Sequence, residues 1–370
     1  MGNFLRRQIG TIFIMLGNSC NMHCKYCLQH PLVEHGLTGH INPDIYPFIE
    51  QVVEENGPDY PLWLHFFGGE PLIYFSAIQE IVSKTKWLKN VRFSTITNGK
   101  AITQEIVDFF NENDFHVAVS WDGKNVRTTR GYDVFAPGSH SRKLLFQLDT
   151  LNVCAVLSSM TYPQDCCDAF QALSKDYFDI HGYPLTFGFD PILDTGLGDK
   201  SLVDMDYDRV RREVGAMTER YMKFRTEGTE MKIAERAFME PIFSNLQRVV
   251  QPEKKIWNRQ YCPCGNGYNI LNMDLAGNLY HCHNVSQKSG SIYTPYFQYL
   301  NEVLKHETTF SRREKCMKCP AMLYCRGGCK LVQDKDMESG MCRLRKAIFQ
   351  PVLDAAIAYG RKVMGGKDGC

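Results

Sequence analysis

Short apolar runs alternate with longer segments of helical periodicity through the first half of the chain. The runs are rich in β-branched and aromatic residues and predict six strands: Thr11–Leu16, Leu62–Phe67, Arg92–Thr97, His116–Ser120, Val153–Ser158 and Leu185–Phe189. Apolar residues at helical spacing predict helices between them, over Pro43–Glu55, Ser76–Leu88, Gln104–Asn113, Ser141–Leu148 and Gln164–Tyr177. Asn42 and Pro43 fit the N-cap and the first turn of the first helix. Alternating strands and helices predict an α/β fold with a parallel sheet, and six units are too few for a closed eight-stranded barrel. We therefore expect an open, partial (β/α)6 TIM-like barrel.

The second half of the chain changes character twice. Residues 201–260 are helical and charged, and from residue 261 onward cysteine, glycine and short loops dominate. The last region has too little continuous apolar sequence to fold on its own core, so bound metal clusters would have to stabilise it. We expect three parts: a barrel over 1–200, a helical bridge over 201–260, and a cysteine-rich domain with a C-terminal helix over 261–370.

Composition narrows the class of protein. The formal net charge is +1 and 22% of residues are charged, which argues against a nucleic-acid partner or an electrostatic membrane patch. The apolar run before Cys20 is too short to span a membrane and leads directly into a cysteine motif, so we interpret it as a strand and not as a signal peptide. We expect a cytoplasmic protein. Fifteen cysteines then favour metal ligation, because reducing compartments disfavour structural disulfides.

The first cysteine group follows the first predicted strand. Cys20, Cys24 and Cys27 are separated by three and two residues. Three thiolates at this spacing suit a cubane 4Fe–4S cluster and leave one iron open for a substrate group. The alternative is a zinc site completed by His23 or His30.

The first cysteine group, with Tyr26 as its aromatic residue, resembles the signature of the radical S-adenosylmethionine (SAM) enzymes. Three further segments resemble motifs of that superfamily in the same order, each at the end of a predicted strand: Gly68-Gly69-Glu70-Pro71, Thr97-Asn98-Gly99 and Ser120-Trp121-Asp122-Gly123. Arg130 matches an arginine that contacts the SAM carboxylate in related enzymes. The resemblance implies that SAM binds at Tyr26, Gly68, Gly69, Glu70, Asn98, Ser120, Asp122 and Arg130. It also implies that SAM is cleaved to a 5′-deoxyadenosyl radical, which abstracts hydrogen from the substrate.

The second cysteine group resembles the seven-cysteine SPASM domain. Gly277 and Cys282 are followed by Cys316-x2-Cys319-x5-Cys325-x3-Cys329 and Cys342. A pair of zinc ribbons is the alternative, which the single CxxC disfavours. The resemblance implies two auxiliary clusters, an outer one on Cys316, Cys319, Cys325 and Cys342, and an inner one on Cys264, Cys282, Cys329 and Cys262. The resemblance therefore implies three [4Fe-4S] clusters in all. Whether Cys262 is the fourth ligand of the inner cluster stays open, and without it one iron of that cluster would be free to bind a substrate.

The resemblance extends to anaerobic sulfatase-maturing enzymes and to maturases of ribosomally made peptides. In the former an aspartate after the Gly-x4-Cys motif serves as base, and here His283 stands at that position. Histidine can accept a proton near neutral pH, although His283 could equally be a plain loop residue. We expect an oxidoreductase or peptide maturase that crosslinks, oxidises or epimerises a peptide or protein substrate, with a flavodoxin or ferredoxin as electron donor. The alternatives are a radical SAM dehydrogenase or rearrangement enzyme acting on a small molecule, and a non-catalytic iron–sulfur electron carrier or sensor.

Overall fold

The computed structural model describes residues 8–29, 40–195, 199–250, 264, 267–306, 313–335, 338 and 340–365. Contacts between Cα atoms divide the chain into two units. The first unit comprises Met1–Trp121, Val126–Val153 and Cys264–Glu307, and the second comprises Asp122–Asn125, Cys154–Pro263 and Thr308–Cys370. The three-part division expected from composition stays a prediction.

A mostly parallel sheet forms the centre of the first unit. Strands β1 (Thr11–Met15), β2 (Leu62–Phe67), β3 (Val91–Thr97) and β4 (His116–Ser120) pair in parallel and in chain order. The first residues of β5 (Leu151–Leu157) follow beside β4. Residues predicted as strands therefore form strands, because alternating apolar positions suit a sheet with one buried face.

The other edge of this sheet comes from the C-terminal part of the chain. Strand β7 (Ile270–Asp274) pairs in parallel with β1, so that Phe13 lies opposite Asn272. Strands β8 (Asn278–Tyr280) and β9 (Lys288–Ser291) then add in antiparallel fashion. The sequence pattern predicted no strand here, since the runs are short and their partner is far away in the chain. The cysteine-rich region thus contributes strands to the barrel sheet.

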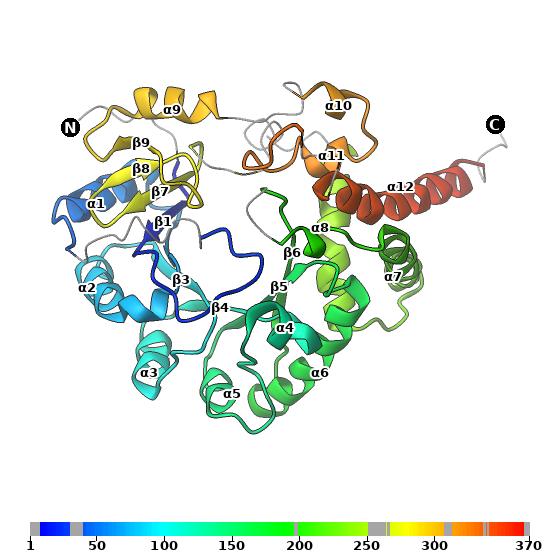
Figure 1. Cartoon of the computed structure of the whole chain (residues 1–370), viewed down its shortest axis with the longest axis horizontal. Coiled ribbons are helices and arrows are strands. Elements are labelled where there is room, and N and C mark those ends of the chain that lie inside the picture. Colours follow the sequence, from blue (N-terminus) through cyan, green and yellow to red (C-terminus); the bar gives the residue numbers. More distant parts are fainter. Residues whose placement is uncertain are drawn as a thin grey trace. The chain divides into compact units, whose positions relative to one another are not determined.

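Helices alternate with the strands of the first unit along the chain. They are α1 (Ile45–Asn56), η2 (Pro71–Tyr74), α2 (Phe75–Thr85), α3 (Gln104–Glu112), α4 (Val126–Arg130), α5 (His140–Leu145) and α9 (Tyr296–Lys305). Figure 1 shows α1, α2 and α3 along the outside of these strands. The prediction that Asn42 caps the first helix is wrong: the helix begins at Ile45 with Asp44 as N-cap. Asn42 instead accepts from the Asp44 backbone N–H at 3.0 Å, in an Asx turn before the helix.

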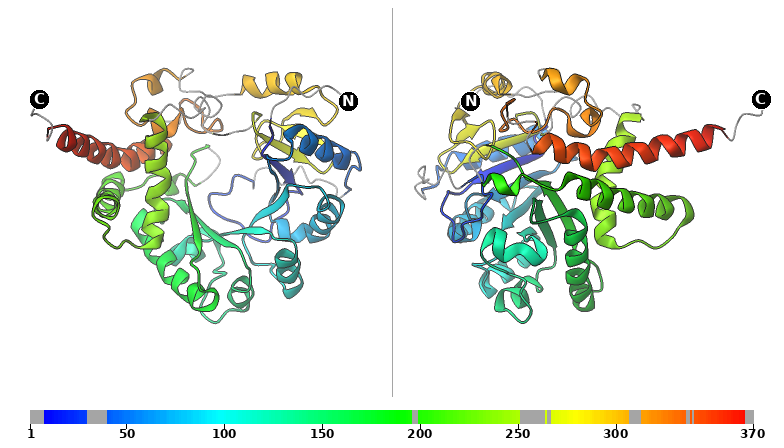
Figure 2. Two further views of the ribbon diagram at one scale, coloured as in Figure 1. Left: turned by 180° about the vertical axis from the view of Figure 1, so that it is seen from behind. Right: turned by 45° about the vertical axis from the view of Figure 1, so that its right-hand side comes forward.

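The second unit is mainly helical. Its strands are the rest of β5 and the neighbouring β6 (Thr186–Pro191). Its helices are η3 (Gly123–Asn125), α6 (Pro163–His181), η4 (Lys200–Leu202), α7 (Tyr207–Glu227), α8 (Ile233–Val250), α10 (Glu314–Met317), α11 (Met322–Cys325) and α12 (Met341–Gly365). Helix α12 lies along α7, as Figure 2 shows. The segment 201–250 is helical as predicted, and Asp206 caps α7 by accepting from the Arg209 backbone N–H at 2.9 Å. In the described part of the chain, no helix has the length and apolar character needed to cross a membrane.

Candidate functional site

The first three cysteines lie in the loop that follows β1. The Cys27 backbone N–H donates to the Cys24 carbonyl at 3.1 Å, which closes a tight turn between these two residues. The Lys25 backbone N–H donates to the Thr129 carbonyl at 3.0 Å and so fixes the loop against α4. Burial raises the pKa of the Cys20 thiol, and the nearby Glu70 and Cys27 raise it further. Cys20 and Cys27 are therefore close enough to interact.

Two glycines at the end of β2 hold the beginning of this loop. The backbone N–H of Gly69 donates to the Gly17 carbonyl at 2.8 Å. A Cβ atom on Gly69 would lie 2.4 Å from the carbonyl oxygens of both Asn18 and Ser19, and one on Gly68 would lie 2.3 Å from the Gly17 carbonyl oxygen. Glycine is required because the Cys20 loop approaches the backbone here. Their predicted contact with SAM stays a prediction.

The Glu70 carboxylate joins β2 to the end of β3. It is buried and accepts three hydrogen bonds, from the backbone N–H of Leu72 at 3.0 Å, the Thr97 hydroxyl at 2.5 Å and the backbone N–H of Asn98 at 2.8 Å. Burial raises the pKa of Glu70, while these three donors oppose the shift. The carboxylate therefore fixes the Thr97-Asn98-Gly99 turn.

Asn98 in turn reaches the cysteine loop. Its side-chain amide donates to Asn21 Oδ1 at 2.8 Å and to Cys20 Sγ at 3.8 Å. Lys100 also donates from Nζ to the Asn21 carbonyl at 3.2 Å. Two of the predicted motifs, at the ends of β2 and β3, thus make direct contact with the first cysteine group.

The remaining SAM candidates lie in two places. In the first unit, the Arg130 guanidinium lies 5.2 Å from the centre of the Tyr26 ring, and Ser120 is half-buried at the end of β4. Asp122 belongs to the second unit, where its carboxylate accepts from the Val156 backbone N–H at 3.1 Å. The structure therefore brings Arg130 and Tyr26 together, whereas Asp122 makes this bond to β5.

A cluster of four rings lies beside Cys282 on the half-buried face of the sheet. The His283 ring stacks on Phe13 with centroids 4.7 Å apart and meets the edge of Phe67 at 4.6 Å. His65 lies 4.6 Å from Phe13, and its Nδ1 is 2.8 Å from the Ser94 hydroxyl oxygen. Burial, and then His283, lower the pKa of His65 to about 3, so His65 is neutral near pH 7.

The loop that carries His283 is tied to the first cysteine group by Gln29. Its side-chain amide donates to the His283 carbonyl at 3.0 Å and also contacts Asn284 Oδ1. Sequence analysis missed Gln29, Phe13 and Phe67 as parts of the site. The two phenylalanines were hidden in ordinary strand patterns, and only their position on the half-buried face distinguishes them.

The second unit gathers four further thiols. Cys316 interacts electrostatically with Cys325 and Cys319, and Cys342 interacts with all three. Burial and then these neighbouring thiols raise the pKa of Cys342 to about 11. The thiols that the resemblance assigns to the outer cluster therefore lie together. Cys329 packs against the buried cluster of Cys316, Val332 and Met341, and its backbone N–H lies 3.4 Å from Met341 Sδ.

The predicted inner set is only partly described. Cys264 and the buried Cys282 belong to the first unit, Cys329 belongs to the second, and Cys262 lies outside the described residues. Among the residues whose placement is given, no three His, Cys, Asp or Glu side chains are arranged to hold a single metal ion.

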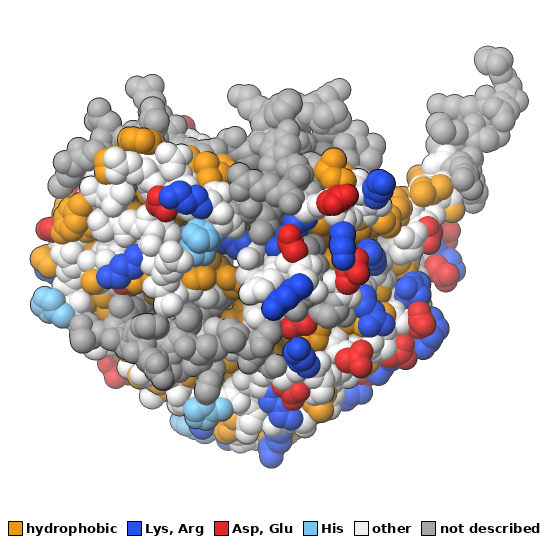
Figure 3. Space-filling model, turned by 45° about the horizontal axis from the view of Figure 1, so that its top comes forward, with side chains coloured by type: hydrophobic (Ala, Val, Ile, Leu, Met, Phe, Trp, Pro, Cys, Tyr) orange, Lys and Arg blue, Asp and Glu red, His pale blue; other side chains and the backbone are white. Residues whose placement is uncertain are grey.

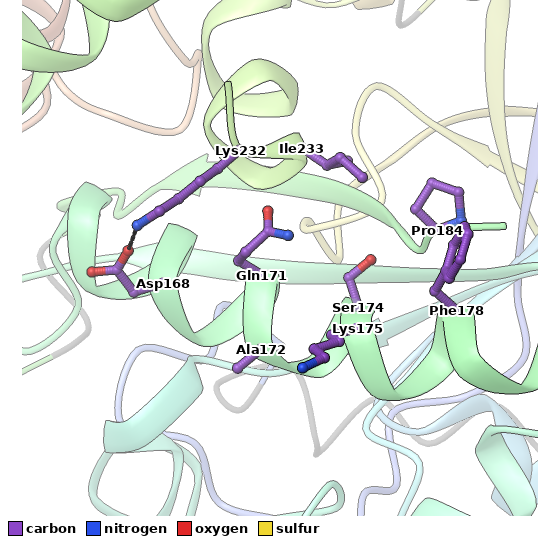
Figure 4. Close-up of a pocket in the computed structure, with 9 residues that line it drawn as sticks. All are labelled: Asp168, Gln171, Ala172, Ser174, Lys175, Phe178, Pro184, Lys232 and Ile233. Atoms are coloured by element: carbon purple, nitrogen blue, oxygen red, sulfur yellow. Dashed lines mark hydrogen bonds and ion pairs between the residues drawn. The ribbon is translucent and has the colours of Figure 1, made fainter. Parts of the chain in front are cut away.

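A surface groove of about 660 Å³ lies elsewhere in the second unit, along α6 and the beginning of α8 (Figure 4). An ion pair of 2.8 Å between Lys232 and Asp168 crosses it, and Phe178 and Pro184 line another part. None of the predicted site residues lines this groove.

Basic and acidic side chains are interspersed on the face drawn in Figure 3, in keeping with the formal net charge of +1.

Comparisons with known proteins agree with these motifs. A family model described as a 4Fe-4S single cluster domain matches residues 9–134. Radical SAM cyclopropyl synthase TigE of Paramaledivibacter caminithermalis is 28% identical over 134 residues, which cover 32% of this chain and 28% of that protein. The chain thus spans less than a third of this relative. The cysteine-type anaerobic sulfatase-maturating enzyme of Clostridium perfringens is 24% identical over 364 residues, which cover 90% of this chain and 93% of that enzyme.

Two solved structures share the fold. Native anSMEcpe with bound AdoMet matches with a TM-score of 0.68 at 19% identity, over 95% of this chain and 99% of that one. Streptococcus suis SuiB bound to its precursor peptide SuiA matches with a TM-score of 0.57 at 15% identity, over 88% of this chain and 72% of that one. The predicted resemblance to radical SAM enzymes with a SPASM domain is confirmed. So is the predicted α/β fold class, with a parallel sheet and a cysteine-rich C-terminal region.

Proposed function

We propose that this chain is a radical SAM/SPASM enzyme that modifies a peptide or protein substrate by hydrogen abstraction. The observation that carries the proposal is the loop of Cys20, Cys24 and Cys27, held at the carboxyl ends of parallel strands by Gly69 and Asn98. The carboxyl ends of barrel strands are where enzymes of this architecture carry their chemistry.

The residues of the first unit fit a 4Fe–4S cluster and SAM. Cys20, Cys24 and Cys27 offer three thiolates, one fewer than a cubane has irons, so one iron is left for SAM. The Asn98 amide already donates to Cys20 Sγ, in keeping with a ligand sulfur that receives hydrogen bonds. When bound, the cluster supplies the electron that cleaves SAM to methionine and a 5′-deoxyadenosyl radical. Arg130 would pair with the SAM carboxylate. The rest of the proposed binding set is Tyr26, Gly68, Gly69, Glu70, Asn98 and Ser120, with Asp122 of the second unit.

His283 is the proposed proton acceptor for the substrate. It lies on the half-buried sheet face with Phe13 and Phe67, and Gln29 holds its backbone. The pKa of His65 is lowered to about 3, so His65 is a poor proton acceptor near pH 7, and the proposed role rests on His283, which follows Cys282 where the resemblance puts the base. Oxidation or crosslinking of the substrate removes two hydrogens, whereas epimerisation leaves its mass unchanged.

Two auxiliary clusters complete the proposal. Cys316, Cys319, Cys325 and Cys342 would hold the outer one, and Cys262, Cys264, Cys282 and Cys329 the inner one. The parts of the chain would then be a barrel over 1–200, a helical bridge over 201–260 and a cluster-binding domain over 261–370. A flavodoxin or ferredoxin would deliver electrons, and the thiolate ligands suit the reducing cytoplasm.

A peptide substrate is favoured over a small molecule by the relatives. One solved structure of anSMEcpe contains AdoMet and the Cp18Cys peptide, and SuiB is bound to a precursor peptide. A second candidate function, dehydrogenation or rearrangement of a small molecule, would use the same radical. A non-catalytic electron carrier has no need of the residues proposed to bind SAM.

Anaerobic reconstitution followed by reduction in the presence of SAM tests the function. We expect 5′-deoxyadenosine from the intact chain and none from a variant with Cys20, Cys24 and Cys27 all changed to alanine. Cys154→Ala, in β5, is the control and should retain the product. Full iron content without 5′-deoxyadenosine would favour the carrier. Mass spectrometry of peptides encoded beside the gene, after incubation with the enzyme, then identifies the modification. The same assay with small molecules in place of the peptides tests the second candidate function.

A further inference from the structure

Two arginines lie against the four thiols gathered in the second unit. Arg313 is buried, with 5% of its surface exposed, and its Nε lies 3.0 Å from Oδ1 of the exposed Asp334. It donates from Nη1 to the Gly327 carbonyl at 2.9 Å and from Nη2 to the Val332 carbonyl at 2.6 Å. Its own carbonyl accepts from the Cys316 backbone N–H at 2.8 Å. Arg313 therefore joins three parts of the cysteine loop, and its charge lowers the pKa of Cys316 and Cys325 against the larger effect of burial.

Arg345 approaches the same thiols from α12. Its guanidinium lies 5.0 Å from the centre of the Tyr324 ring, which stacks on Phe349 with centroids 5.7 Å apart. The Nε atom of Arg345 is buried and has no hydrogen-bond partner within the described residues. Burial lowers the pKa of Arg345, but Tyr324, Cys325 and Asp190 together outweigh that effect and raise it. Arg345 also lies one helical turn after Cys342 on α12, and Tyr324 directly precedes Cys325, so a permanent positive charge lies in the region of two proposed ligands.

Burying a guanidinium is costly unless negative charge compensates it. Four thiolates around a cubane cluster give a group with net negative charge, and reduction makes that group more negative by one electron. A nearby positive charge stabilises the reduced form more than the oxidised form, particularly where the surroundings have a low dielectric constant. Net charge and hydrogen bonds to the sulfurs are known determinants of iron–sulfur potentials.

We propose that Arg345 is a potential-setting residue for the outer auxiliary cluster, and that Arg313 supplies a second charge while holding the ligand loop. The inference rests on the proposed ligation of this cluster by Cys316, Cys319, Cys325 and Cys342. It assigns the two residues different roles. Arg345 contacts the cluster region through its side chain alone, whereas Arg313 also carries three hydrogen bonds of the loop.

Redox titration of the full chain, followed by EPR spectroscopy, tests this role. The background is the variant with Cys20, Cys24 and Cys27 changed to alanine, which leaves the auxiliary clusters as the only signals. Arg345→Gln removes the charge and Arg345→Lys keeps it. The control is Arg343→Gln, because Arg343 is an exposed residue of the same helix whose guanidinium lies 4.3 Å from the centre of the Tyr207 ring. We expect Arg345→Gln to shift one midpoint potential to a more negative value, and the other two variants to leave it near the parent value.

The outcomes separate this inference from the proposed function. Unshifted potentials in Arg345→Gln with full iron content, or an equal shift in Arg343→Gln, would overturn the role of Arg345. If Arg345→Gln loses its iron, the Arg345→Lys variant distinguishes the two explanations. A normal potential and iron content in Arg345→Lys would show that the positive charge is what matters. Loss of iron in Arg345→Lys as well would show that Arg345 has a packing role instead. Iron content that Cys319→Ala leaves unchanged would refute the ligation itself.

Discussion

Replacing Glu70 with glutamine tests the polar centre of the site at almost unchanged volume. The carboxylate accepts from the Leu72 backbone N–H, the Thr97 hydroxyl and the Asn98 backbone N–H, at 3.0, 2.5 and 2.8 Å. Glutamine has one accepting oxygen and one NH2 group. If the oxygen keeps the Leu72 and Thr97 partners, the NH2 group faces the Asn98 N–H, and a buried donor loses its acceptor.

The magnitude follows from that lost bond. A hydrogen bond to a charged group contributes about 1.5–3 kcal/mol, and a buried donor without a partner costs a similar amount. Burial of the charge offsets part of this, since it raises the pKa of Glu70 in the folded chain. We expect Glu70→Gln to lower the free energy of unfolding by about 2 kcal/mol. That corresponds to a fall of roughly 2–3 °C in the thermal midpoint if all 370 residues unfold together.

The assay is thermal unfolding under anaerobic conditions, with iron content measured on the same samples. The matched control is Glu80→Gln, because Glu80 accepts from the Tyr46 hydroxyl at 2.9 Å at the exposed surface. Its effect should stay within about 0.5 kcal/mol. If the Glu70 variant is as stable as the Glu80 variant, the carboxylate does not fix the Asn98 turn.

Three other substitutions give clear expectations. Gly69→Ala places a Cβ atom 2.4 Å from two carbonyl oxygens of the Cys20 loop, and should cost about 3 kcal/mol and lower the iron bound after reconstitution. Its control, Gly360→Ala, meets nothing within 4 Å and should raise the free energy of unfolding by about 1 kcal/mol; equal effects would contradict the steric argument. The pKa of His65 is lowered to about 3, below the ordinary 6.5, so the folded state loses stability as pH falls from about 6.5 toward 3. His65→Phe should reduce this slope by up to about 1.4 kcal/mol per pH unit, measured by urea unfolding from pH 7 to 5, and an unchanged slope would show that His65 protonates freely in the folded chain.

The sequence determined most of the local elements and supplied the motifs that resemble those of radical SAM enzymes. The runs at Leu62–Phe67 and His116–Ser120 form strands with those same bounds, because period-two alternation is a local property of the chain. The spacing of the first three cysteines is also a local property of the chain, and it favoured iron–sulfur ligation. Helix boundaries were less certain: Asn42 uses its side chain for a turn, and the helix starts at Ile45.

Only the tertiary structure decided which distant segments meet. The pairing of β7 with β1 joins residues more than 250 positions apart, so no local pattern announces it. The same is true of Gln29 with His283, and of Arg345 with the Tyr324 ring. Glu70 shows the difference most clearly. Its motif was visible in the sequence, and its bond from Leu72 is local, but its donors at Thr97 and Asn98 lie on another strand end that only folding brings to the buried carboxylate. Spacing along a chain fixes which groups are available, and long-range packing fixes which of them touch.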